Sequence, residues 1–149
     1  TVGDLLAHAK FKAAITEAMR IVGLANAYIS AQEPWKLKDN PERRDTVLHV
    51  ALQVVSDVNT MLTPFMPHSA QKIYEALGGE GVWAAQPELV ETDGAAPILM
   101  GDYASEKASW GRREIAVGTL LAKPSPIFRK LDAKLAETGP EWAPVNPQS

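Results

Sequence analysis

A tryptophan and four basic side chains stand close together in the first third of the sequence. Trp35 follows a proline, and the basic residues come after it: Lys36, Lys38, Arg43 and Arg44. An indole ring can stack on a nucleobase, a contact worth about 1–3 kcal/mol, and lysine and arginine can contact phosphates. Trp35 could instead fold back on the preceding helix as a hydrophobic lid, with the basic side chains in solvent. The local pattern leaves both interpretations open.

Asn26 is a second candidate, because it is a polar residue among apolar neighbours before the Pro34–Trp35 pair. A polar side chain on a largely apolar helix needs a hydrogen-bonding partner. Asn26 could bond the edge of a base or position the segment that carries Trp35. The alternatives are that it faces solvent or bonds a neighbouring helix.

The residue types needed for catalysis or metal binding are missing or wrongly spaced. The sequence has no cysteine, and His8, His49 and His68 lack the spacing of metal ligands. The glycines at 78, 79 and 81 follow a predicted helix, whereas phosphate-binding glycines lead into one. We therefore expect no catalytic residue, no metal and no cofactor in this chain.

The composition is that of a globular domain of 149 residues, with 46% hydrophobic and 22% charged residues. A formal net charge of −3 means that any contact with a polyanion must come from a local patch. No apolar run approaches the roughly 20 residues of a membrane span, and no signal peptide is present. Because the sequence begins with Thr1, we expect a piece of a longer protein.

Helical periodicity dominates the first 80 residues. Apolar residues recur at helical spacing over residues 4–29, including Phe11, Ile15 and Met19, and this helix should end near residue 32, before Pro34. A second helix should begin after Asn40, a good N-cap, and extend to residue 62. A third should span residues 68–77, with Gly78 ending it.

The remaining residues predict a different organisation. Residues 81–136 should form a long irregular tail that wraps the helices, with short helices at 104–109, 112–121 and 126–136, and residues 137–149 a flexible Pro-rich terminus. Trp83 and Trp110 could anchor this tail on the helices of residues 1–80 or contact another domain. The two long helices make an incomplete bundle, so we expect a further helix upstream of Thr1.

Several short motifs resemble one known family. They are LANAYI at residues 24–29, PW at 34–35, LTPFMP at 62–67, KIY at 72–74 and LG at 77–78. These motifs are similar to the anticodon-binding domain of class I aminoacyl-tRNA synthetases. The segment PIFRKLD at residues 126–132 favours, within that class, the bacterial-type methionyl-tRNA synthetases. The resemblance covers residues 1–135 approximately.

The resemblance implies a mostly α anticodon-binding helical bundle and specific roles. It implies that Trp35 contacts the first anticodon base, that Asn26 supports that site, and that Pro34 sets the direction of the ring. Lys36, Lys38, Arg43 and Arg44 are the candidate phosphate contacts. The implied partners are a tRNA, either the methionine tRNA or the initiator tRNA, and the catalytic domain of the same protein. The implied location is the cytoplasm, and no membrane contact is expected.

The sequence also departs from the family. The ATP-binding signatures are absent, so ATP with Mg²⁺ would bind only in a catalytic domain outside this chain, and this fragment alone would not activate methionine. Two alternatives remain open. The module could belong to a leucyl-, isoleucyl- or valyl-tRNA synthetase, or it could be a stand-alone helical protein-interaction module that binds no RNA.

Overall fold

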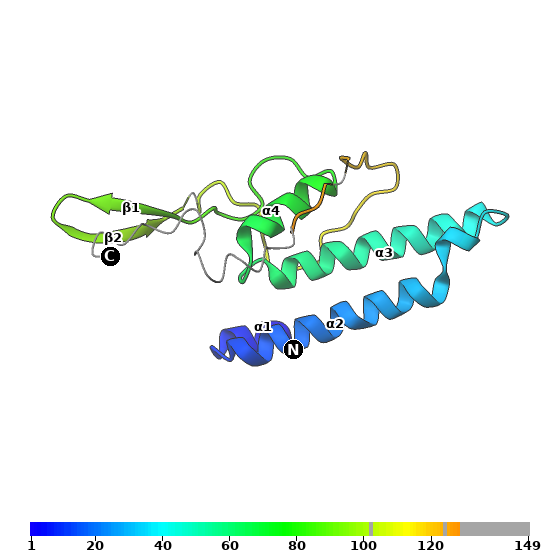
Figure 1. The fold of residues 1–149 in the computed structure, drawn as a ribbon, viewed down its shortest axis with the longest axis horizontal. Helices are drawn as coiled ribbons and strands as arrows, with labels where there is room; N and C mark the ends of the chain where they lie inside the picture. The colour runs from blue at the N-terminus through cyan, green and yellow to red at the C-terminus, as the bar shows by residue number, and fades with distance from the viewer. Residues whose placement is uncertain (102, 124, 129–149) are drawn as a thin grey trace, which may run out of the picture.

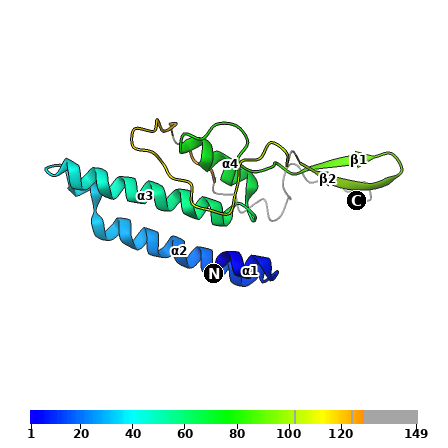
Figure 2. The ribbon, with the colours of Figure 1, turned by 180° about the vertical axis from the view of Figure 1, so that it is seen from behind.

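The computed structural model describes residues 1–101, 103–123 and 125–128, and its architecture is mostly helical (Figure 1). The elements in chain order are α1 (Val2–Ala7), α2 (Phe11–Gln32), the 3-10 helix η1 (Pro34–Lys36), α3 (Pro41–Leu62), α4 (Pro67–Ala76), β1 (Glu88–Thr92) and β2 (Ala95–Met100). The predicted mostly α fold is confirmed. The loop between α2 and α3 lies at one end of the molecule and the β1–β2 hairpin at the other (Figures 1 and 2).

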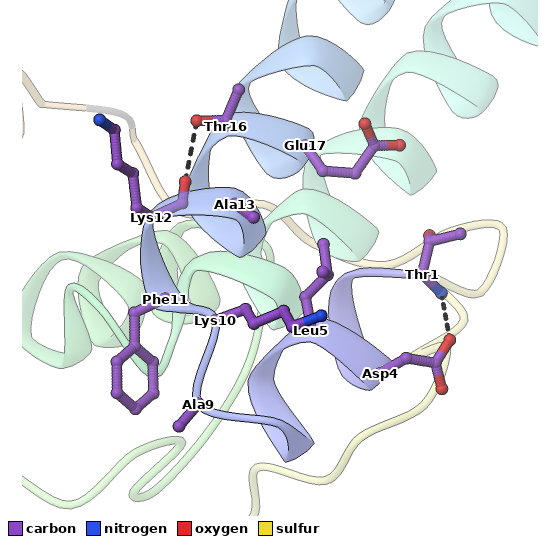
Figure 3. A pocket seen from close by; sticks show the side chains of 10 residues that line it. All are labelled: Thr1, Asp4, Leu5, Ala9, Lys10, Phe11, Lys12, Ala13, Thr16 and Glu17. Carbon is purple, nitrogen blue, oxygen red and sulfur yellow. Dashed lines mark hydrogen bonds and ion pairs between the residues drawn. The ribbon is translucent and has the colours of Figure 1, made fainter.

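The first predicted helix is interrupted at residues 8–10, so the expectation of one continuous helix was wrong. Ala9 adopts a left-handed conformation with φ of 54°. The amide of Ala9 donates to the carbonyl of Leu6 at 2.9 Å, and that of Lys10 donates to Leu5 at 2.8 Å. This pair of bonds is the Schellman motif that ends helices, here with alanine in place of glycine. Figure 3 shows the resulting elbow between α1 and α2, with Phe11 at the start of α2.

The two long helices α2 and α3 lie side by side and antiparallel (Figures 1 and 2). The buried residues of α2 are the small Ala14 and Ala18, which belong to a core with Val2 and Leu62. The first half of the apolar stripe predicted for this helix is exposed: Phe11 at 58%, Ile15 at 37% and Met19 at 53%. The further helix was expected on a second apolar edge, where Leu24 is 57% exposed.

Helix α3 begins as predicted, because the Asn40 side chain accepts a hydrogen bond from the amide of Arg43 at 3.1 Å. Helix α4 also ends as predicted, since Gly78 has a φ of 75° that glycine adopts without strain. No helix in the described part of the chain is long and apolar enough to cross a bilayer.

Buried polar side chains of α3 hold the tail along the helix. The side-chain amide of Gln53 donates to the Arg113 carbonyl at 2.8 Å, and its oxygen accepts from the Ile115 amide at 3.1 Å. Ser56 donates to the same Arg113 carbonyl at 3.2 Å. The Arg113 carbonyl and the Ile115 amide therefore bond α3 instead of taking part in a helix of their own. The predicted helices at 104–109 and 112–121 are absent, and most of that predicted at 126–136 lies outside the described residues.

The β1–β2 hairpin was not predicted from the sequence. Its strands are antiparallel and pair Leu89 with Leu99 and Val90 with Ile98, and the turn includes Gly94 at φ of 73°. The hairpin projects beyond the helices (Figure 1). The described tail is therefore an anchored extended segment that also carries a hairpin, rather than a chain of short helices.

Replacing Gln53 by leucine is expected to release the tail from α3. The substitution leaves the buried Ile115 amide without its acceptor, a loss worth about 1–3 kcal/mol. Native-state hydrogen exchange on the full-length protein should show the Ile115 amide opening more easily by that amount. Thr46→Ala, at an exposed position of the same helix, should change the exchange by less than about 0.5 kcal/mol. Equal protection in Gln53→Leu and the native protein would contradict this anchoring role.

Candidate nucleic-acid interface

The loop that carries Trp35 is built on a hydrogen-bonded backbone. Helix α2 ends at Gln32, and Glu33 follows in a left-handed conformation with φ of 44° and donates its amide to Ile29 at 3.1 Å. The loop then makes three bonds to carbonyls three residues back: Lys36 to Glu33 at 2.8 Å, Leu37 to Pro34 at 3.2 Å and Asn40 to Leu37 at 3.3 Å. These bonds fix the course of the backbone on both sides of Trp35.

Pro34 and Trp35 occupy opposite environments within this loop. Pro34 is buried, and η1 contacts α3. The Trp35 side chain is 57% exposed, and no ring contact is recorded for it within the described residues. A tryptophan that served as a lid on the helix end would be buried, so the exposed fraction argues against that interpretation. The arrangement presents an indole to solvent from a fixed backbone, which is what base stacking needs.

Asn26 is exposed on α2 and lies seven residues before Glu33. Seven residues are about two helical turns, or about 10 Å, so Asn26 shares a face of α2 with the residue where the chain turns into the loop. Within the described residues, no hydrogen bond joins the Asn26 side chain to the loop. The structure therefore leaves the Asn26 side chain available to a ligand approaching that face.

The four basic residues near Trp35 differ in their partners. Lys36 pairs with Glu33 at 2.7 Å, and Arg44 pairs with Asp45 at 2.9 Å. Arg43 bonds the neutral side chain of Gln32, whereas Lys38 has no hydrogen bond or ion pair in the described part of the chain. Of these four residues, Lys38 and Arg43 are therefore the two that form no ion pair in the described part of the chain.

The formal charge of this region is balanced. Residues 33–45 contain four basic and four acidic side chains, which gives a net charge of zero. In the first half of α2, away from the loop, a hydrogen bond from Arg20 lowers the pKa of Glu17, and the same contact raises the pKa of Arg20. Because the cations near Trp35 are not in excess, the net charge of this region does not by itself favour binding of a polyanion.

The other two described tryptophans, Trp83 and Trp110, contact other residues of this chain. Trp83 is 4% exposed, stacks on Tyr74 with ring centroids 5.0 Å apart, and donates its indole N–H to the Thr63 hydroxyl at 2.9 Å. Trp110 is 55% exposed, and a Cβ added to Gly3 would lie 2.6 Å from its indole nitrogen. The Trp110 ring therefore packs directly on α1 at Gly3. Trp83 is thus an anchor of the tail on the helices.

The described residues contain no group of three or more histidine, cysteine, aspartate or glutamate side chains that could hold a metal ion. Gln32, which accepts a hydrogen bond from Arg43, was not predicted from the sequence. Its partner is eleven residues away in the sequence, and no local spacing rule points to such a pair.

Comparison with known proteins places these features in a family. The family described as "Anticodon-binding domain of tRNA ligase" matches residues 1–113, which include α1 to α4, the Trp35 loop and the hairpin. A match over that much of the sequence shows that the chain belongs to this family.

Three relatives have the same name. The chain is 90% identical to a methionine–tRNA ligase of Cutibacterium acnes over 99% of its own length, 64% identical to that of Saccharopolyspora erythraea over 97%, and 57% identical to that of Corynebacterium urealyticum over 97%. These matches cover 24%, 26% and 27% of the respective relatives. The chain therefore spans about a quarter of the length of the curated relatives it matches.

Proposed function

We propose that this chain is the anticodon-binding region of a methionine–tRNA ligase. In this proposal the whole protein activates methionine with ATP and transfers it to tRNA, and this region binds the anticodon of methionine tRNA, including the initiator. The single observation that carries the proposal is the exposed Trp35 indole on a hydrogen-bonded loop. The names of the relatives favour methionine over a leucine, isoleucine or valine enzyme.

The proposed roles follow the environments of the side chains. Trp35 stacks on the first anticodon base, and buried Pro34 sets the direction of the ring. Asn26 supports the site from α2, where its amide can bond the edge of a base. Lys38 is the strongest candidate for a phosphate contact, since no carboxylate pairs with it in the described part of the chain. Lys36 and Arg44 are weaker candidates, because Glu33 and Asp45 already hold them.

We propose that ATP and Mg²⁺ bind outside this chain. Gly78, Gly79 and Gly81 follow the end of α4, and anions bind at helix N-termini. We assign ATP and Mg²⁺ to a catalytic domain in the part of the protein outside this chain. That catalytic domain is also the proposed partner of residues 81–136. In this proposal residues 1–80 form the anticodon-binding bundle. The proposal includes a cytoplasmic location, where the tRNA is charged for translation.

Removal of the anticodon bases tests this function directly. The full-length protein should bind an anticodon stem–loop RNA with the sequence CAU at least about fivefold more tightly than the same RNA with abasic sugars at the anticodon. Both RNAs carry every phosphate, so the salt dependence of binding should be similar for the two. Fluorescence anisotropy of the labelled RNAs measures both. Equal affinities would show that the bases are not read and would overturn the proposal.

A further inference from the structure

One side-chain hydrogen bond closes the base of the Trp35 loop. Nη2 of Arg43 donates to Oε1 of Gln32 at 2.5 Å. Gln32 is the last residue of α2, and Arg43 lies in the first turn of α3. Trp35 lies between them in the sequence. The bond therefore ties together the two helix ends from which the loop emerges.

Both partners of this bond are held by helix ends. The amide of Arg43 donates to the Asn40 side chain at 3.1 Å, which fixes the first turn of α3. Glu33, directly after Gln32, donates its amide to Ile29 at 3.1 Å and so fixes the last turn of α2. A contact between two fixed points constrains the distance between the ends of α2 and α3, and the 3-10 helix η1 between them contacts α3.

The contact of Arg43 with Gln32 differs from the neighbouring ion pairs because Gln32 is uncharged. Lys36 and Arg44 each face a carboxylate, which offsets their charge. Gln32 is neutral, so it orients the guanidinium of Arg43 and leaves its positive charge intact. Gln32 carries no charge, so its removal leaves the net charge of the loop unchanged. Its side-chain amide can itself donate to a phosphate or a base edge, and the variants below distinguish that direct contact from positioning.

We propose that Gln32 and Arg43 form a clamp that positions the Trp35 indole for base stacking. Gln32 is a positioning residue in this assignment, because it acts through Arg43 and the loop rather than on the RNA. The proposal rests on the function proposed above, and it adds two residues that set the affinity of that site. Arg43 thus contributes by holding Gln32, in addition to any phosphate it reaches.

The test is a set of variants of the full-length protein, measured for binding to the CAU stem–loop RNA. Gln32→Ala should weaken binding by about threefold to tenfold, the effect of one lost hydrogen bond. Arg43→Ala should weaken it at least as much, and the Gln32→Ala/Arg43→Ala double variant no more than Arg43→Ala alone. Arg44→Ala, which removes the same charge one residue later and leaves the clamp intact, is the matched control. It should weaken binding less than Arg43→Ala.

A second cycle tests whether the clamp acts through Trp35. In a Trp35→Ala background, Gln32→Ala should have no further effect on RNA affinity. Hydrogen exchange of the RNA-free protein gives a readout of position alone: the amides of Lys36 and Leu37 should exchange faster in Gln32→Ala, while those of α4 stay unchanged.

The outcomes separate this inference from the proposed function. If Trp35→Ala weakens binding and Gln32→Ala does not, the clamp is overturned and base stacking stands. If Gln32→Ala weakens binding equally with and without Trp35, Gln32 acts elsewhere and the clamp is again overturned. If Trp35→Ala itself leaves binding unchanged, base stacking fails and the clamp fails with it.

Discussion

Replacing Trp35 by alanine is expected to weaken binding of the full-length protein to methionine tRNA by about 5- to 150-fold. This range corresponds to the roughly 1–3 kcal/mol by which one base stacks on an aromatic ring. The loss should be large because the indole is exposed and its backbone is already fixed, so little ordering is needed on binding. Activation of methionine, measured by pyrophosphate exchange without tRNA, should be unchanged.

The matched control is Trp110→Ala. Trp110 is exposed to nearly the same degree, 55% against 57%, but it packs on α1 and is far along the chain from the loop. Its replacement removes the same aromatic ring and should leave tRNA affinity within about twofold of the native value, in keeping with its assignment as a contact within the domain. Equal losses in the two variants would indicate a general effect on folding. Unchanged binding in Trp35→Ala would return Trp35 to the role of a surface residue.

Replacing Trp83 by alanine is expected to cost about 3–5 kcal/mol in the free energy of opening the region around α4. The buried indole is one of the largest side chains in that cluster, and it stacks on Tyr74. Its N–H bond to Thr63 joins the tail to the end of α3. Native-state hydrogen exchange of the α4 amides in the full-length protein measures the loss.

Trp83→Phe separates the two contributions, since phenylalanine keeps an aromatic ring and lacks the indole N–H. It should cost less than Trp83→Ala but more than zero, because the Thr63 hydroxyl loses its donor. Trp110→Ala, at an exposed position, should lower the free energy of opening the region around α4 by less than either Trp83 substitution. A small effect of Trp83→Ala would mean that the tail is not anchored through this side chain.

The helix ends that sequence predicted well are those with a local signal. Asn40 with Pro41 placed the start of α3, Pro34 placed the end of α2, and Gly78 placed the end of α4. Each signal acts within one helical turn and depends on one residue type. Tertiary contacts do not overrule such signals easily, because a cap or a proline changes which backbone bonds can form at all.

The features that sequence did not predict depend on distant partners or on an unusual residue. Ala9 ends α1 where glycine is the common choice, so its neighbours gave no warning. The buried polar residues of α3 bond a segment about sixty positions later. The hairpin is the exception, because the Asp93–Gly94 pair between its strands is a local hairpin signal that the prediction of an irregular tail did not take into account. Pro97 in the second strand is an opposing local signal.

In the candidate site, too, sequence predicted the residue types but not their environments. The type and neighbours of Trp35 identified it as a ring that could stack, but the exposed fraction that supports stacking over a lid came only from the fold. Its basic neighbours were grouped as equivalent phosphate contacts. Their partners distinguish them, because an ion pair with Glu33 or Asp45 is a matter of side-chain geometry that composition does not contain.

The way α3 holds the tail has a consequence for how this domain can diverge. Gln53 and Ser56 bond the carbonyl of Arg113 and the amide of Ile115, which are atoms that nearly every residue type supplies. These bonds themselves do not depend on the side-chain types of the tail, although Ile115 is buried and the Arg113 guanidinium lies over the Tyr74 ring. Substitutions at the exposed Glu114 should therefore leave the path of the tail unchanged, whereas proline at position 115 would remove the donated hydrogen. Variation between the two residues that hold the tail is thus compatible with a constant main-chain path.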